Sequence, residues 1–165
     1  MSELKTSFEQ RGFQNVVTYI NSGNVLFDSE LDEATTKGIC ETLITDSFGL
    51  DIPVCVISAA ELTEAVSHAP DWWNKEADAK HNAFFVIPPM TAKKLCDIAS
   101  ELKDEYEKAA YYGRVIFWSA PTATFSRTRW SKMVSDKSVY RSITVRNANT
   151  TLKLNEIVNG DLDEQ

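Results

Sequence analysis

The residues best suited to chemistry lie near the C-terminal end, in the stretch TVRNANTTLKL (144–154). Arg146 stands beside Asn147 and Asn149, after a strand-like apolar run and before a helix-like one. An asparagine oxygen often caps a helix by accepting from its first free amides. The same helix end favours an anion, to which an arginine can add two hydrogen bonds. Two interpretations stay open: a helix cap with Arg146 paired to an acid, or a site for a phosphate or carboxylate.

A second group of cations lies in FSRTRWSKM (125–133), where Arg127, Arg129 and Lys132 alternate with Trp130. Arginines beside an aromatic residue suit nucleic acid, through phosphate contact and base stacking. They equally suit a domain interface, where Trp and Arg are enriched. The sequence contains no RNP motif of the kind that RNA-binding plaits carry. Nucleic acid is therefore the less favoured partner, although it is not excluded.

The charge of the chain is uneven. The 165 residues include 17 Lys and Arg against 24 Asp and Glu, a net charge of −7. From Arg114 to Lys153 there are eight cations and one acid, or +7, which leaves nine cations and 23 acids, or −14, elsewhere. Such a basic segment can guide an anion to one place, or it can be a solvated face paired with the acidic half. We predict a small anionic ligand bound by Arg127, Arg129, Lys132, Arg141, Arg146, Asn147 and Asn149.

The sequence gives little sign of an enzyme. It has no G-x-S-x-G, no P-loop and no G-x-G-x-x-G. His68 and His81 lack H-E-x-x-H spacing and paired cysteines, so we expect no metal site and no cofactor. A Cys–His pair that includes Cys55 or Cys96 stays open, but no feature favours it. No catalytic residue can be named, and enzymatic activity is left undecided.

The cysteines and the apolar runs indicate where the protein resides. Cys40, Cys55 and Cys96 are odd in number, widely spaced and set in apolar surroundings. They are typical of buried free thiols in a reducing compartment, so we expect a cytoplasmic protein. No apolar run approaches the roughly 20 residues that span a bilayer, and the polar start at 1–5 does not resemble a signal peptide.

The hydrophobic pattern predicts mixed α and β structure in two halves. The first half should contain a helix at 2–11 capped by Ser2, strands at 16–20 and 25–27, a helix at 32–48, a strand at 52–57 and a helix at 58–68. Ser58 and Glu61 should form a capping box at the start of this last helix. The second half should contain a strand at 82–87, a helix at 91–102, strands at 106–111 and 114–118, a helix at 126–134, a strand at 140–145 and a helix at 149–158. The tail from 159 to 165 is acidic and should be frayed.

The second half therefore runs β-α-β-β-α-β-α, which matches the ferredoxin-like plait. The first half matches the same plait without its opening strand. We predict an α+β fold of two tandem ferredoxin-like (α/β plait) halves, the first lacking its opening strand. Residues 1–69 form the partial N-terminal half, 70–80 a linker, and 81–165 the C-terminal half with an extra C-terminal helix.

Two long motifs carry a family resemblance. TYINSGNVLF (18–27) and SITVRNANTTLKL (142–154) resemble the uncharacterised bacterial domain-of-unknown-function 1697 family. Trp73, the segment 80–82 that leads into a strand, and the segment 126–133 also fit, so the resemblance covers nearly the whole chain. It implies two ferredoxin-like halves in one bacterial protein, and it implies no established activity.

The chain departs from that family at its start. Members usually begin with a strand and an Arg-Gly-Ile-Asn-Val-Gly-Gly type loop, whereas residues 1–4 match only the helix after that loop. In a ferredoxin-like plait the first strand lies inside the sheet, and each buried amide left unpaired costs about 1–3 kcal/mol. We expect either that the true start lies upstream or that a strand of another chain, as in a homodimer, fills the gap.

Three functions follow from these observations. The first is an anionic-ligand-binding module that uses a basic C-terminal face. The second is a small enzyme that acts on a phosphorylated or carboxylated metabolite at the same place. The third is a protein-interaction domain whose basic face binds an acidic partner or the protein's own acidic half.

Overall fold

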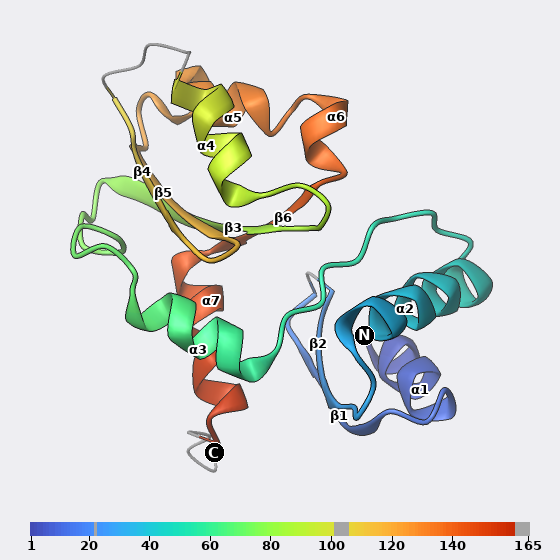
Figure 1. The fold of residues 1–165 in the computed structure, drawn as a ribbon. Coiled ribbons are helices and arrows are strands. Elements are labelled where there is room, and N and C mark those ends of the chain that lie inside the picture. The colour runs from blue at the N-terminus through green and yellow to red at the C-terminus, as the bar shows by residue number, and fades with distance from the viewer. Residues whose placement is uncertain (22, 101–105, 161–165) are drawn as a thin grey trace. The chain divides into compact units, whose positions relative to one another are not determined.

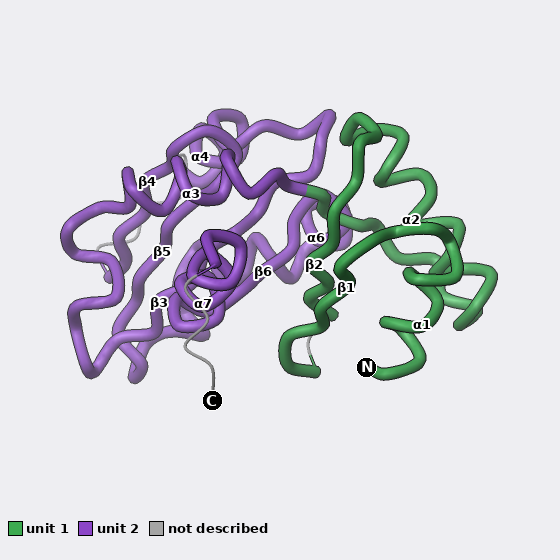
Figure 2. The backbone as a smooth tube through the Cα atoms, turned by 90° about the horizontal axis from the view of Figure 1, so that it is seen from below, with its two compact units in different colours: residues 1–56 green, residues 57–165 purple. Residues whose placement is uncertain are grey.

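The computed structural model of the chain describes residues 1–21, 23–100 and 106–160. Within these ranges it is a mixed α+β structure with two sheets and seven α-helices (Figure 1). The chain divides into two compact units, unit 1 (1–56) and unit 2 (57–165), shown in different colours in Figure 2. The division lies upstream of 70–80, where the sequence predicts a linker.

Unit 1 contains α1 (Ser2–Gln10), β1 (Gln14–Tyr19), β2 (Asn24–Asp28) and α2 (Glu33–Phe48). The two strands form an antiparallel hairpin, and α1 and α2 pack on it around one apolar cluster (Figure 1). The rings of Phe8, Phe13 and Phe27 lie at the centre of that cluster, with centroids 4.4 to 5.4 Å apart. These four elements agree with the predicted ones apart from small shifts at their ends.

Two predictions for unit 1 are wrong. Ser2 does not cap α1, because it is already helical and no side chain caps this helix. The strand predicted at 52–57 does not form, since residues 49–58 belong to no strand. The run Ile52-Pro53-Val54-Cys55-Val56-Ile57 has strand propensity, but a strand also needs a neighbour to pair with. The sheet of unit 1 consists of β1 and β2 alone among the described residues.

Unit 2 is built on a four-stranded antiparallel sheet in the order β4-β5-β3-β6. Its elements are α3 (Ala59–Ser67), β3 (Ala79–Val86), α4 (Ala92–Ser100), β4 (Lys108–Tyr112), β5 (Val115–Pro121), the short helix η1 (Phe125–Arg127), α5 (Arg129–Met133), α6 (Lys137–Tyr140), β6 (Ile143–Asn147) and α7 (Ala148–Val158). The predicted helix at 126–134 is therefore divided into η1 and α5. The strand predicted at 140–145 begins only at Ile143, because α6 ends at Tyr140. Leu102 and residues 161–165 lie outside the described residues.

Helices cover both faces of the unit 2 sheet. Figure 1 shows α4, α5 and α6 on one face and α3 and α7 on the other. Side chains alternate along a strand, so Phe84 and Trp118 pack with Trp130 of α5, whereas Phe117 points to the opposite face. There Trp73 meets Phe117 edge-on at 4.9 Å and donates to the Asn82 carbonyl at 3.0 Å.

Helix α3 belongs to unit 2 because its contacts lie there. Asn159 Nδ2 donates to Thr63 Oγ1 at 3.0 Å, and Arg114 pairs with Glu61 at 3.1 Å. The predicted capping box is confirmed: the Ser58 hydroxyl accepts from the Glu61 amide, and the Glu61 carboxylate accepts from the Ser58 amide. This local motif fixes the start of α3, and its tertiary contacts place the helix on the sheet.

No helix in the described part of the chain combines the length and the apolar character that crossing a membrane requires.

Glu41 of α2 ties the unpaired segment after α2 to unit 1. Its Oε1 accepts from the Val54 amide at 3.0 Å and pairs with Lys37 Nζ at 2.6 Å. Partial burial acts to raise the pKa of Glu41, but the Lys37 hydrogen bond, the Val54 amide and the Lys37 charge outweigh it, so the pKa is lowered from 4.5. The ionised carboxylate is thus the form that the folded unit favours.

We predict that Glu41 makes the stability of unit 1 depend on pH. A lowered folded-state pKa gives stability that is present above the unfolded value and is lost as the pH falls through the folded one. Glu41→Gln should therefore lower the stability of unit 1 at pH 7 and reduce its dependence on pH below about 4.5. Urea unfolding of both proteins between pH 3 and 7 measures this. Parallel pH profiles for the two proteins would contradict it.

Candidate functional site

Four exposed cations lie on the helical layer formed by η1, α5 and α6. We call this the basic helical surface, and it consists of Arg127, Lys132, Lys137 and Arg141. Lys137 begins α6 and Arg141 follows its end. The side chains of Arg127 and Lys132 make no hydrogen bond or ion pair with any described residue. These two cations are therefore available to a ligand.

The buried side of the same layer explains why these cations point outward. Trp130 and Met133 of α5 and Val139 of α6 are buried in the core cluster between the sheet and these helices. Residues three apart lie on one face of a helix, so Lys132 is left on the outer face of α5. Thr128 fixes the start of α5 by accepting from the Ser131 amide at 3.2 Å. Local capping and core packing together position the basic helical surface.

Asp136 is the one acid between Arg114 and Lys153, and it has a structural role. It caps α6, with Oδ1 accepting from the Ser138 amide at 2.8 Å and from the Ser138 hydroxyl at 2.5 Å. These hydrogen bonds, the hydroxyl first, lower the pKa of Asp136. Its charge is thus directed at the start of α6.

Arg129, a predicted ligand-binding residue, is engaged inside unit 2. Its Nε lies 2.8 Å from Oε1 of Glu107, whose side chain is completely buried. The contact is ionic rather than a directed hydrogen bond, because neither atom has a hydrogen-bond partner of good geometry. The other oxygen of Glu107 accepts from Trp118 Nε1 at 2.7 Å. Glu107 therefore links α5 to the central strands.

The three remaining predicted residues lie near β6 and the start of α7. Arg146 is paired in register with Ala83, so it faces the side of the sheet that α3 and α7 cover, not the side of the basic helical surface. Its Nη1 donates to Thr144 Oγ1 at 2.9 Å and to the Val145 carbonyl at 2.7 Å. The seven predicted residues are thus divided between the two faces of the sheet.

The two asparagines of this stretch differ in role. Asn147 is the cap of α7, with Oδ1 accepting from the Thr150 amide at 2.8 Å. Asn149 lies exposed in the first turn and is not the capping residue. The predicted cap is therefore provided by Asn147, while the predicted pairing of Arg146 with an acid stays a prediction.

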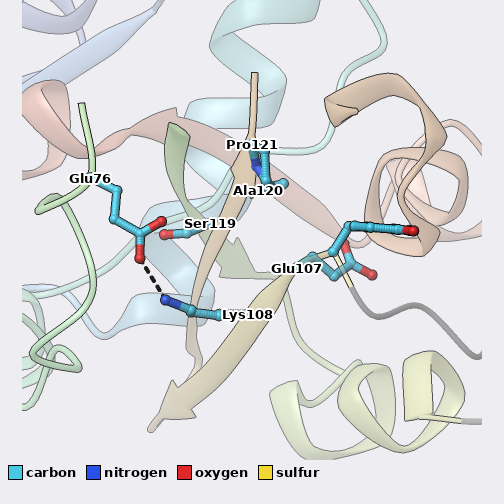
Figure 3. A pocket seen from close by; sticks show the side chains of 7 residues that line it. Glu76, Glu107, Lys108, Ser119, Ala120 and Pro121 are labelled. Carbon is cyan, nitrogen blue, oxygen red and sulfur yellow. Dashed lines mark hydrogen bonds and ion pairs between the residues drawn. The ribbon is translucent and has the colours of Figure 1, made fainter. Parts of the chain in front are cut away.

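A cavity of about 210 Å³ opens at the end of β4 and β5 (Figure 3). It is lined by Glu76, Tyr106, Glu107, Lys108, Ser119, Ala120 and Pro121. Glu76 and Lys108 form an ion pair of 2.6 Å at its wall. Lys108 and Ser119 are opposite one another on β4 and β5, and Ser119 is also opposite His81 on β3.

His81 holds the segment before β3 against the sheet. Its Nδ1 accepts from the Asn74 amide at 3.1 Å and contacts the Ser119 hydroxyl, while Nε2 lies 2.9 Å from the Glu76 carbonyl. A carbonyl only accepts, so the ring proton is on Nε2 and Nδ1 is the acceptor. These contacts anchor residues 74–76 to the sheet.

Two of the cysteines have little nucleophilic character. Burial raises the pKa of Cys40 and of Cys96 to about 11, so both thiols keep their protons near neutral pH. None of the three cysteines forms a disulfide. Among the described residues no group of His, Cys, Asp and Glu could hold a metal ion.

The comparisons with known proteins establish the family. A sequence model described as "Protein of unknown function (DUF1697)" matches residues 1–117. The chain belongs to this family. The structure is similar to that of the conserved bacterial protein SP0830 from Streptococcus pneumoniae, with a TM-score of 0.85 and 24% identity over 96% of this chain and 88% of that chain. At this identity the similarity shows the fold. None of the curated proteins compared matches the sequence.

We predict that Asn147 and Asn149 contribute unequally to stability. Asn147→Ala should lower the free energy of unfolding by about 1 kcal/mol, because it removes the cap of α7. Asn149→Ala is the matched control and should change it much less, since Asn149 is exposed and is not the cap. Chemical denaturation measures both. Equal losses for the two variants would contradict the assignment of the cap.

We predict that Glu107 is essential for the stability of unit 2. Glu107→Ala should lower the free energy of unfolding by about 3–5 kcal/mol, because it leaves the Arg129 charge without this buried partner. Glu107→Gln keeps an oxygen for Trp118 Nε1 and should cost less. Thermal and urea unfolding measure the difference. A loss below about 1 kcal/mol for the alanine variant would show that the pair is not important.

Proposed function

We propose that unit 2 binds an anionic ligand through the basic helical surface. The observation that carries the proposal is four exposed cations on one helical layer, with the only acid of the segment committed to capping α6. Exposed charges of one sign repel each other, and they attract oppositely charged ligands. Phosphate and carboxylate groups are the ligands that such a surface selects.

The charge of the rest of the chain supports the proposal. Unit 1 has three cations and nine acids, so its charge is −6, while the whole chain is at −7. The segment from Arg114 to Lys153 is at +7. A cationic segment in an acidic protein concentrates the attraction for anions on one part of the molecule.

The proposed binding surface contains only some of the residues that the sequence predicts to bind the ligand. Arg129 is engaged with Glu107, and Arg146 and Asn147 lie near the opposite face of the sheet. Anion binding at Arg146, Asn147 and Asn149 stays a prediction for a separate position.

The composition of the basic helical surface also bears on the two alternative functions, catalysis and the binding of an acidic protein. An enzyme needs a general acid or base within hydrogen-bond reach of its ligand. Among the described residues of η1, α5 and α6 the only acid is the capping Asp136 and there is no histidine. This favours binding over catalysis there. An acidic protein partner would use the same cations, and the experiment below separates it from a small anion.

We also propose that unit 2 is a ferredoxin-like plait and that the protein is cytoplasmic. The strand order β4-β5-β3-β6, with antiparallel neighbours throughout, supports the plait. Three cysteines that form no disulfide support a reducing compartment.

We predict that removing two cations of the basic helical surface weakens anion binding. The double variant Arg127→Ala/Lys132→Ala should bind inorganic tripolyphosphate roughly 5–30-fold more weakly, for two exposed contacts of up to about 1 kcal/mol each. Calorimetry at 50 and 200 mM salt measures affinity and its salt dependence, which should fall in the variant.

The matched control is Lys93→Ala/Lys94→Ala, which removes the same charge from exposed positions of α4. It should bind as the unchanged protein does. Equal weakening in the two double variants would mean that net charge alone acts. No binding of tripolyphosphate by the unchanged protein would contradict a small-anion site, and the interaction with an acidic protein would become the better proposal.

A further inference from the structure

The basic helical surface includes an exposed aromatic ring that the sequence does not single out. Tyr140 of α6 is 67% exposed. Lys137, Tyr140 and Arg141 are three and four positions apart, so their side chains lie on one face of α6. The neighbouring Val139 is buried in the core of unit 2. The packing of α6 therefore directs the ring of Tyr140 outward, on the same face as two cations.

The Tyr140 ring has no partner within the described part of the chain. Its side chain makes no hydrogen bond, ring contact or ion pair with any described residue. A phosphate or carboxylate group is bound by cations and gains nothing from a ring beside them. A nucleobase does gain, because its flat face stacks on an aromatic side chain whatever the identity of the base. The ring thus points to an anion that also contains bases.

The sheet of unit 2 offers no such stacking position. RNA-binding plaits stack bases on aromatic side chains of an exposed sheet face. Here helices cover both faces (Figure 1), and Phe84, Phe117 and Trp118 are buried. The lack of an RNP motif therefore argues against binding on the sheet, and it does not bear on binding by the helices.

The extent of the surface favours a strand over a single nucleotide. Its four cations are distributed over η1, α5 and α6, where successive phosphates of one strand can contact several of them. Sites for small molecules are usually concave, but the cavity in Figure 3 contains no residue of this surface. A base within a duplex is already stacked on its neighbours, so stacking on Tyr140 requires a single strand.

We propose that the basic helical surface binds single-stranded nucleic acid, with its phosphates on the four cations and one base stacked on Tyr140. The inference rests on the proposed function, anion binding at this surface, and names the class of ligand. Phosphate contacts and stacking discriminate little between bases. Binding is therefore tolerant of sequence and weakens as the salt concentration rises.

The test is fluorescence anisotropy of the full chain with labelled oligo-uridine and oligo-thymidine of roughly 12 nucleotides. Tyr140→Ala should weaken binding by about 5–100-fold, because one stacked base is lost, and it should leave the salt dependence unchanged. Tyr140→Phe keeps the ring and should bind as the unchanged protein does. Arg127→Ala/Lys132→Ala should weaken binding and reduce its salt dependence.

Two controls separate the ring from the charges and from a general effect on the fold. Tyr111→Ala removes an exposed tyrosine of β4, outside the surface, and should bind the oligonucleotides as the unchanged protein does. Tyr140→Ala should bind inorganic tripolyphosphate normally, because this anion does not use the ring. A duplex of the same length and uridine monophosphate should both bind more weakly than the single strands.

Each outcome decides the inference. Weaker strand binding by Tyr140→Ala, but not by Tyr140→Phe or Tyr111→Ala, supports it. Equal strand binding by Tyr140→Ala and the unchanged protein overturns it, and the proposed function stands if tripolyphosphate is still bound. Uridine monophosphate or a duplex that binds as tightly as the single strands also overturns it. Failure of the unchanged protein to bind both tripolyphosphate and the single strands overturns the inference and the proposed function together.

Discussion

Backbone pairing of the central strand β3 is the constraint on which unit 2 depends. β3 is bordered by β5 on one side and β6 on the other, so its amides and carbonyls have partners along both edges. Buried backbone groups without partners are costly, and a strand with two neighbours satisfies most of them. The register of β3 also places His81 opposite Ser119 and Ala83 opposite Arg146. The sheet therefore determines which side chains can meet.

The basic helical surface is a consequence of how one face of that sheet is covered. Trp130, Met133 and Val139 fill the space over Phe84 and Trp118, and this packing turns the intervening polar residues outward. The buried Glu107 fixes α5 from within through Arg129 and Trp118. One cation, Arg129, is thereby used for structure, whereas Arg127 and Lys132 remain exposed. Within this segment Arg129 stabilises the fold, and the proposed ligand contacts are made by other residues.

The sequence predicts well what local chemistry decides. The helix predicted at 32–48 forms at Glu33–Phe48, and the predicted capping box of Ser58 and Glu61 is confirmed. The sequence also predicts an asparagine cap at the start of the last helix, and Asn147 provides it. What depends on distant partners is predicted poorly. The pattern of the run at 52–57 predicts a strand, but this run pairs with no strand in the described part of the chain. The Arg129–Glu107 pair joins residues 22 positions apart, and the contact of His81 with Ser119 depends on strand register. No pattern of residues that are close in sequence predicts either of these two contacts.

The central claim is that the pairing of β3 along both of its edges holds unit 2 together. Hydrogen exchange of the free protein, resolved by residue in NMR, tests it most directly. The account predicts that the amides of Ala83 to Val86 exchange only through global unfolding of unit 2. Exchange of these amides through local opening, orders of magnitude faster than global unfolding allows, would contradict the claim.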